Sequence, residues 1–312
     1  DAIIITHPKF EEQANRLAKH RGTQGWKVAV VSTHDIYKEF YAGEKSPFAI
    51  RKFLQFANQK WPKPAPAYLT LMGDASWDPR KNLPGSVNED YIPSYGSPTS
   101  DFWYTLLDGN DYLTEMVVGR LPVTTIDEAK NVVDKLIEYD SLPAAPWKKV
   151  FMFLSGPGFE TAYVPVDMYV TPSPFCGDTV RIGSEKNSAV DYTKTTKIRT
   201  AINNGALWLA FNGHSSADFF ELDGWRVEDL NNISRYNILT TYSCTSGDFA
   251  KPDGVARNES YVTEARKGSI AAFGNTALGV VGTDATTFTR MFEAVATDTT
   301  RRLGDILKYA KF

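Results

Sequence analysis

Short apolar, β-branched runs alternate with amphipathic stretches along most of the chain, and this alternation restricts the possible folds more than any other feature. The run AIIIT precedes the stretch FEEQANRLAKHRG, whose apolar residues fall near helical spacing. The pattern restarts at VFMFLS and continues through ALWLAF and NILTTYS. Strands joined by helices run parallel and lie buried beneath those helices. The sequence therefore predicts an α/β fold of mainly parallel sheets flanked by helices.

The chain is long enough for two hydrophobic cores. It has 312 residues, and single cores stop growing at roughly 250–300 residues. Residues 75–100 are rich in Pro, Gly, Ser, Asn and Asp, which indicates a long surface loop. The segment PAAPWKK, at residues 143–149, is typical of a linker. We predict two subdomains, residues 1–146 and residues 147–312, each built on its own sheet.

The composition argues against several kinds of partner and cofactor. The net charge is −3 and the sequence shows no basic stripe, which argues against nucleic acid. No apolar run approaches the roughly 18 residues that span a membrane. Two cysteines cannot build a disulfide framework. The chain has no Walker loop and no paired zinc motif, so we expect no organic cofactor. It begins directly with a strand pattern, which suggests an excised or processed form.

A histidine and a cysteine follow two successive apolar runs. His214 comes just after ALWLAF, and Cys244 comes just after NILTTYS. Ligands of open α/β sheets bind at the carboxyl ends of the strands, and a thiol nucleophile needs an imidazole nearby to move protons. The alternative is an inert buried thiol and a histidine in a turn. The loop cysteine, Cys176, has no such context, and we interpret it as structural.

The stretch LDGNDYLTEM concentrates oxygen-bearing side chains. Asp108, Asn110, Asp111 and Glu115 lie within eight residues. Calcium binds six to eight oxygens, and these include backbone carbonyls. A tight Asp-Gly turn with solvated acids is the alternative. The pattern alone favours the turn.

Several motifs together resemble those of the gingipain-type cysteine peptidases, family C25 of the caspase-like clan. They are GHSS, which begins at residue 213, TTYSCTSGDF, which begins at residue 240, and SDFWYTLLDGND, which begins at residue 100 and is followed by VVGRLPV. The resemblance covers most of the chain from Tyr68 to Phe273. It implies two caspase-like subdomains and protein or peptide substrates. It also implies Cys244 as nucleophile, His214 as general acid/base, and an oxyanion hole made by backbone N–H groups of Ser215 and Cys244.

The sequence departs from the family pattern at three places. Ser215 stands where family members usually have glycine. The acidic residue that orients the histidine is expected near Gly156, but the nearest carboxylate in the sequence is Glu160. Glycine and valine at residues 279–281 stand where an aromatic pocket wall is expected. These departures leave the orienting residue unidentified.

The resemblance also implies a specificity residue and a metal site. Asp167 falls where an aspartate pairs with the basic substrate residue before the cleaved bond (P1) in arginine-specific members, although it could equally be a cap or a solvated residue. A structural calcium ion is implied in the first subdomain. Its ligands would be the carbonyls of Asp108 and Leu113 and the carboxylates of Asp111 and Glu115, with Asp74 as a neighbour.

We therefore expect a secreted or surface cysteine endopeptidase of bacterial origin, as the resemblance implies. One alternative is a sortase-like member of the same family that processes C-terminal signals of proteins exported by type IX secretion. The other is a decayed peptidase that keeps the fold as a binding module. The sequence does not indicate an oligomeric state.

Overall fold

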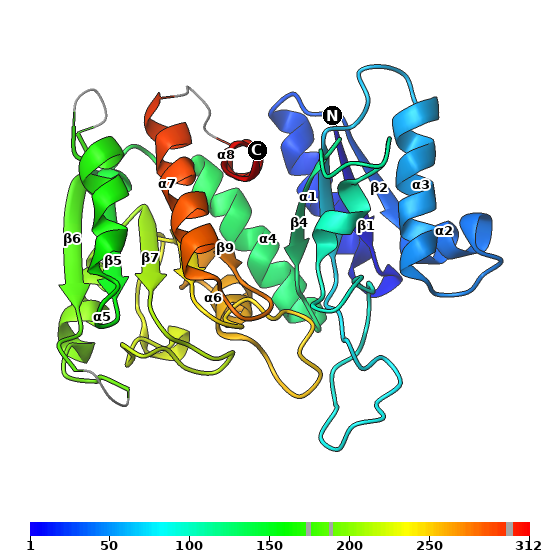
Figure 1. Cartoon of the computed structure of the whole chain (residues 1–312). Helices are drawn as coiled ribbons and strands as arrows, with labels where there is room; N and C mark the ends of the chain where they lie inside the picture. The colour runs from blue at the N-terminus through cyan, green and yellow to red at the C-terminus, as the bar shows by residue number, and fades with distance from the viewer. Residues whose placement is uncertain (173–175, 187–189, 298–301) are drawn as a thin grey trace. The chain divides into compact units, whose positions relative to one another are not determined.

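The computed structural model describes residues 1–172, 176–186, 190–297 and 302–312. In these ranges the chain forms two parallel sheets with helices packed against them (Figure 1). It divides into two compact units, residues 1–137 with 249–254, and residues 138–248 with 255–312. The predicted α/β fold with two mainly parallel sheets is confirmed. The predicted subdomain boundary at residue 146 stays a prediction.

The first sheet has the strand order β2-β1-β3-β4, and all its pairs are parallel. Its strands are β1 (Ala2–Thr6), β2 (Val28–Ser32), β3 (Tyr68–Met72) and β4 (Val117–Leu121). The accompanying helices are the short η1 (Pro8–Phe10) and η2 (Asp101–Thr105), with α1 (Glu11–Thr23), α2 (Thr33–Phe40), α3 (Pro47–Lys60) and α4 (Ile126–Ser141). Helix α3 begins where Ser46 Oγ accepts a hydrogen bond from Phe48 N, with Pro47 at the first helical position.

The second sheet has the order β6-β5-β7-β8-β9 and is also parallel throughout. Its strands are β5 (Val150–Ser155), β6 (Asp178–Gly183), β7 (Trp208–Asn212), β8 (Asn237–Tyr242) and β9 (Ser269–Gly274). Its helices are α5 (Thr195–Asn204), α6 (Arg257–Thr263), α7 (Val281–Thr297) and α8 (Leu303–Lys311), with the short segments η3 (Pro146–Lys149), η4 (Glu160–Tyr163), η5 (Val166–Val170) and η6 (Val227–Asp229).

Successive residues of β7 point to two different cores, which explains why this strand is apolar throughout. Leu209 and Phe211 pack with residues of α5 and α6, whereas Trp208 and Ala210 pack with residues of α7 and α8. Side chains alternate between the faces of a strand, so a sheet covered by helices on both faces needs apolar residues at every position. Both faces of β7 are therefore covered within the second unit.

A short segment far along the sequence belongs to the first unit. Residues 249–254 lie with residues 1–137. Asn88 Nδ2 donates to the carbonyls of Lys251 and Gly254 at 2.7 and 2.6 Å, and Trp77 N donates to the carbonyl of Ala250 at 2.9 Å. The surface loop predicted at residues 75–100 thus supplies the partners of this segment.

None of the helices in the four described ranges is both long and apolar enough to cross a bilayer.

Candidate active site

The ends of β7 and β8 bring His214 and Cys244 to the same edge of the second sheet. The two strands pair in register from Trp208 opposite Ile238 to Asn212 opposite Tyr242. His214 and Cys244 each lie two residues beyond that last pair. A direct contact joins the two loops, because Ser215 Oγ donates to the carbonyl of Cys244 at 2.6 Å.

The thiol lies in a tight, strained turn. Cys244 is free and partly exposed, and the N–H of Gly279 is directed at its sulfur at 3.4 Å. The next residue, Thr245, has φ +51°, which is a rare conformation for a β-branched residue. Its N–H donates to the carbonyl of Ala277 at 2.8 Å. Strain of this kind persists where the surroundings fix the backbone, and it concentrates at functional sites.

Backbone contacts and one aromatic ring hold His214. The ring of Phe159 meets the imidazole edge-on, with ring centroids 5.1 Å apart and an interplanar angle of 88°. The N–H of His214 donates to Glu221 Oε2 at 3.0 Å, and the carbonyl of His214 accepts from the N–H of Glu221 at 2.8 Å. Both backbone polar groups of the histidine are therefore bound to one residue.

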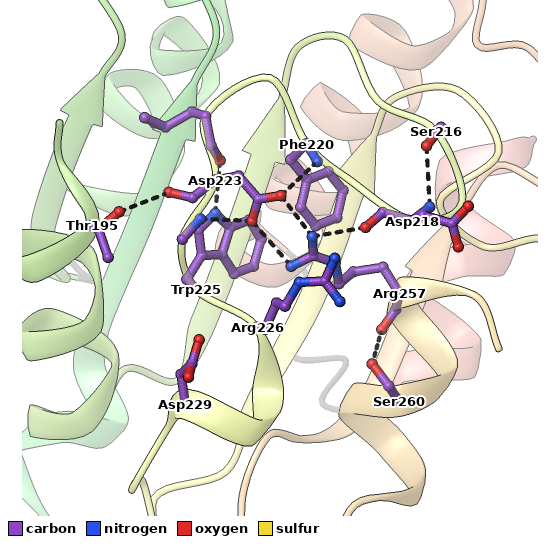
Figure 2. A network of polar contacts seen from close by, with 12 residues as sticks. Thr195, Ser216, Asp218, Phe220, Asp223, Trp225, Arg226, Asp229, Arg257 and Ser260 are labelled. Carbon is purple, nitrogen blue, oxygen red and sulfur yellow. Dashed lines mark hydrogen bonds and ion pairs between the residues drawn. The ribbon is translucent and has the colours of Figure 1, made fainter. Parts of the chain in front are cut away.

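A buried ion pair holds the loop that follows His214. Figure 2 shows the guanidinium of Arg257 and the carboxylate of Asp223 directed toward each other. Their closest atoms are 2.7 Å apart, and the side chains are only 4% and 3% exposed. Asp223 also accepts from the N–H groups of Phe220 and Gly224, at 3.3 and 2.7 Å. The guanidinium carbon lies 4.9 Å from the centre of the Phe220 ring, which stacks on Trp225.

The residue after Arg257 holds the loop that carries the thiol. Asn258 Nδ2 donates to Thr241 Oγ1 at 2.8 Å, and Asn258 N donates to the carbonyl of Ser246 at 3.2 Å. The hydroxyls of Thr241 and Ser246 are also bonded to each other at 2.7 Å. The first turn of α6 therefore contacts both the histidine loop and the cysteine loop.

A carboxylate lies beside the thiol turn. Asn275 Nδ2 donates to Asp284 Oδ2 at 3.0 Å and to the carbonyl of Ser243 at 3.2 Å. Burial raises the pKa of Asp284 above its usual value. Asp284 also lines a cavity of about 540 Å³ whose other lining residues include Tyr242, Thr287 and Arg290.

Asp167 is engaged elsewhere. It lies in the short π-helical segment Val166–Val170. Its carboxylate forms a two-pronged ion pair with Arg181 of β6, in which Nη1 and Oδ2 are 3.2 Å apart. The edge strand β6 is separated from β7 by β5.

The carboxylates of the acidic loop accept hydrogen bonds from their own backbone. Glu115 Oε2 accepts from the N–H groups of Leu107 and Asp108 at 2.6 and 3.2 Å, and Asp111 Oδ1 accepts from Leu113 at 2.9 Å. Over the described part of the chain, no three His, Cys, Asp or Glu side chains are arranged to hold a metal ion. The second oxygens of Asp111 and Glu115 are the donors that the loop offers to a cation.

Asp74 lies at the end of β3 in a different setting from the acidic loop. Its side chain is almost fully buried, and Oδ1 has no hydrogen-bond partner. Burial is the largest influence and raises the pKa of this carboxyl to about 7, while Arg120 opposes the shift. Nearby Glu128 and Asp90 add to the shift.

The remaining predicted positions have ordinary surroundings. Ser215 is not among the described residues with positive φ, so its backbone does not need glycine there. Cys176 is exposed and free. The residues at the expected aromatic wall, Val280 and Val281, are 63% and 68% exposed and offer small apolar side chains beside Gly279.

A parallel sheet whose neighbouring strand ends carry a histidine and a cysteine, within a two-sheet α/β architecture, is the arrangement of caspase-like cysteine peptidases. The model of peptidase family C25 matches residues 1–312, and the chain belongs to this family. The family predicted from the motifs is therefore confirmed.

Named relatives and solved structures agree with this assignment. Gingipain R2 from Porphyromonas gingivalis is 23% identical over 266 residues, which are 79% of this chain and 32% of the relative. The chain thus spans about a third of that relative's length. The crystal structure of the Arg specific cysteine proteinase gingipain R matches with a TM-score of 0.80 at 17% identity, over 99% of this chain and 71% of the other. The complex of pro- and mature domains of the Porphyromonas gingivalis protease RgpB matches with a TM-score of 0.83 at 17% identity, over 99% and 72%. The fold is gingipain-like.

Sequence reasoning missed four contributors to the site: Glu221, Arg257, Asn258 and Asp284. Arg257, Asn258 and Asp284 belong to elements that reach the strand ends only through tertiary packing. Glu221 could have been noticed, because it follows the histidine by seven residues in a segment with turn signals.

Breaking the buried ion pair should destabilise the second unit strongly. The substitution Arg257→Met leaves Asp223 buried without a counter-charge, so we expect a loss of about 3–5 kcal/mol in the free energy of unfolding. Urea denaturation followed by tryptophan fluorescence measures it. Arg226→Met is the matched control, because the Arg226–Glu228 pair is 56% and 59% exposed and should change stability by less than about 1 kcal/mol. Equal effects of both variants would contradict the role given to the buried pair.

The buried carboxyl of Asp74 should make stability depend on pH. Its pKa of about 7 in the folded chain lies above the ordinary value of 3.8 for an aspartate, so the folded state holds a proton that the unfolded state releases. Stability should therefore fall as pH rises between about 4 and 7 and level off above that range. The variant Asp74→Asn cannot titrate at this position. The difference in urea midpoint, variant minus wild type, should therefore increase from pH 5 to pH 8. A constant difference between the two proteins would refute this account.

Proposed function

We propose that the protein is a cysteine endopeptidase in which Cys244 is the nucleophile and His214 the general acid/base. The observation that carries the proposal is the paired geometry of the strand ends. Both residues lie two positions beyond the Asn212–Tyr242 pair, and the Ser215 hydroxyl contacts the Cys244 carbonyl. Membership of family C25 supports the same chemistry.

The reaction follows from the two side chains. The Cys244 sulfur attacks the peptide carbonyl carbon, and His214 takes the thiol proton. His214 then gives that proton to the leaving nitrogen as the C–N bond breaks, which leaves a thioester on the cysteine. Water attacks the thioester, His214 accepts its proton, and the carboxylate product leaves as the thiol is restored. Backbone N–H groups of Ser215 and Cys244 are the proposed donors to the oxyanion.

Thiol labelling tests the nucleophile. Cys176 is exposed and Cys244 only partly exposed, so simple accessibility favours Cys176. Iodoacetamide should nevertheless modify Cys244 at least about 10-fold faster at pH 7, because an adjacent imidazole activates a thiol. Mass spectrometry of labelled peptides gives both rates in one sample, and His214→Ala should remove the difference. Equal slow labelling of both cysteines would indicate the decayed binding module.

We further propose a preference for a basic residue at P1. Two carboxylates are candidates for its partner, Asp167 and Asp284. Arg181 already pairs with Asp167, whereas Asp284 faces a cavity and is linked through Asn275 to the residue before the thiol. The contacts favour Asp284, since no ion pair is recorded for this partly buried carboxylate in the described part of the chain, whereas Asp167 already has one.

Peptide-library cleavage distinguishes the two aspartates. Asp284→Asn should lower kcat/KM for arginine or lysine at P1 by about 10–100-fold relative to neutral residues, the value of one charge-assisted hydrogen bond. Asp167→Asn is the matched control and should change the preference little. Because burial raises the pKa of Asp284, the preference in wild type should also weaken as pH falls. The reverse result for the two variants would assign P1 binding to Asp167.

We propose that the acidic loop binds a structural calcium ion through Asp108, Asp111, Leu113 and Glu115. The donors are carboxylate and carbonyl oxygens, which suit calcium. Because the loop's carboxylates already accept backbone hydrogen bonds, binding must compete with those bonds, and the affinity should be modest. Asp74 is the less favoured neighbour, since its pKa of about 7 leaves it partly protonated at neutral pH.

Thermal unfolding tests the calcium proposal. Calcium should raise the Tm with half-saturation at about 0.1–1 mM, the range of weak extracellular sites, and EGTA should reverse the rise. Magnesium serves as the control ion, and Glu115→Gln should abolish the calcium effect. An unchanged Tm in about 10 mM calcium would refute the site.

We propose that the protein acts outside the bacterial cell or on its surface, on protein or peptide substrates. A sortase-like role differs only in the second half-reaction, where an amine replaces water as the acceptor of the acyl group. Product analysis with and without an added amine nucleophile separates hydrolysis from transfer.

A further inference from the structure

The carboxylate of Glu221 lies beside two glycines, Gly156 after β5 and Gly213 after β7. A Cβ atom on Gly156 would lie 3.0 Å from Cδ of Glu221 and would overlap Oε2. A Cβ atom on Gly213 would lie 3.2 Å from the same Oε2. Neither glycine has a positive φ, so backbone freedom does not explain why they are glycines. This carboxylate occupies the space beside Gly156, and beside Gly213 it shares the space with the ring of Phe211 and the backbone N of Gly156.

Glu221 is also the residue that holds the backbone of His214. Its carboxylate accepts from the histidine N–H at 3.0 Å, and its own N–H donates to the histidine carbonyl at 2.8 Å. The loop between them is closed by the bridge from Ser215 to Phe220. Rotation of the histidine backbone would break at least one of these bonds.

The loop that carries Glu221 is rigid for reasons outside the loop. Asp223 lies two residues further on and forms the buried ion pair with Arg257, as drawn in Figure 2. The preceding residue, Phe220, lies under the same guanidinium. The residues on both sides of Glu221 are therefore held by Arg257, which limits the movement of its backbone.

We propose that Glu221 is the positioning residue for His214, an assignment that rests on the proposed function. It fixes the histidine backbone and brings a carboxylate to the residue whose ring becomes an imidazolium during catalysis. General bases that activate a nucleophile are themselves oriented by a third group. Here that group comes from the loop after the histidine, and two glycines make room for it.

Three variants separate charge from backbone support. Glu221→Gln retains a carbonyl oxygen that can accept from His214 N but removes the charge, whereas Glu221→Ala removes both. Glu160→Gln is the matched control, because Glu160 begins η4 beyond β5 and its carboxylate accepts from Gly158 N at 3.3 Å rather than from His214. Melting curves of all variants establish that they are folded.

Two readouts are measured across pH for each folded variant. The first is kcat/KM on a peptide substrate, and the second is the rate of iodoacetamide labelling of Cys244 relative to Cys176. Glu221→Gln should lower kcat by about 100-fold with little change in KM. It should also move the alkaline limb of the kcat/KM profile to lower pH, because the imidazolium has lost its counter-charge. Glu160→Gln should match wild type.

The outcomes distinguish the two proposals. If wild-type Cys244 labels no faster than Cys176, the proposed function fails, and the assignment of Glu221 fails with it. If wild-type Cys244 is activated and Glu221→Gln keeps the wild-type rate and pH profile, only the assignment of Glu221 is overturned. If Glu221→Ala does not fold, the result with Glu221→Gln decides.

Discussion

The arrangement of the site depends on the buried pair between Arg257 and Asp223. Two charges with side chains 4% and 3% exposed are tolerated only where geometry and further hydrogen bonds compensate for lost hydration. Asp223 meets this condition through the N–H groups of Phe220 and Gly224. The pair therefore specifies one conformation of the loop after the histidine. Since Asn258, the next residue of α6, binds the cysteine loop, one helical turn sets the positions of both loops.

Equal spacing beyond two paired strands places the histidine and the cysteine at the same edge of the sheet. In a parallel pair the residues that follow matched positions leave the sheet side by side. His214 and Cys244 follow the Asn212–Tyr242 pair by the same number of residues. The two loops differ in the contacts that hold them. The histidine loop is held by a buried ion pair, whereas the cysteine loop is held by uncharged hydrogen bonds around the left-handed Thr245.

The sequence allowed prediction of the sheets, the family and the adjacency of the two strands that precede His214 and Cys244, because each depends on local periodicity or on successive strands lying side by side. It did not reveal Glu221 or Asp284 as parts of the site. Their roles come from a loop that folds back and from the packing of α7 against the sheet, and neither leaves a periodic signal. The Asp167–Arg181 ion pair could not be predicted from the sequence for the same reason, since it joins a π-helical segment to an edge strand. The roles of the site residues and of calcium stay predictions.

The segment 249–254 has a consequence for how the protein can be divided. It lies in the first unit, yet it connects the thiol loop, which ends at Asp248, to Val255 and α6. Both flanks of this segment belong to the second unit, so the chain passes between the units three times. No single cut can release the second unit whole, and residues 138–312 alone would carry a segment whose partners, Asn88 and Trp77, had been removed. The first unit is thus covalently joined to the cysteine loop at Asp248 and to α6 at Val255.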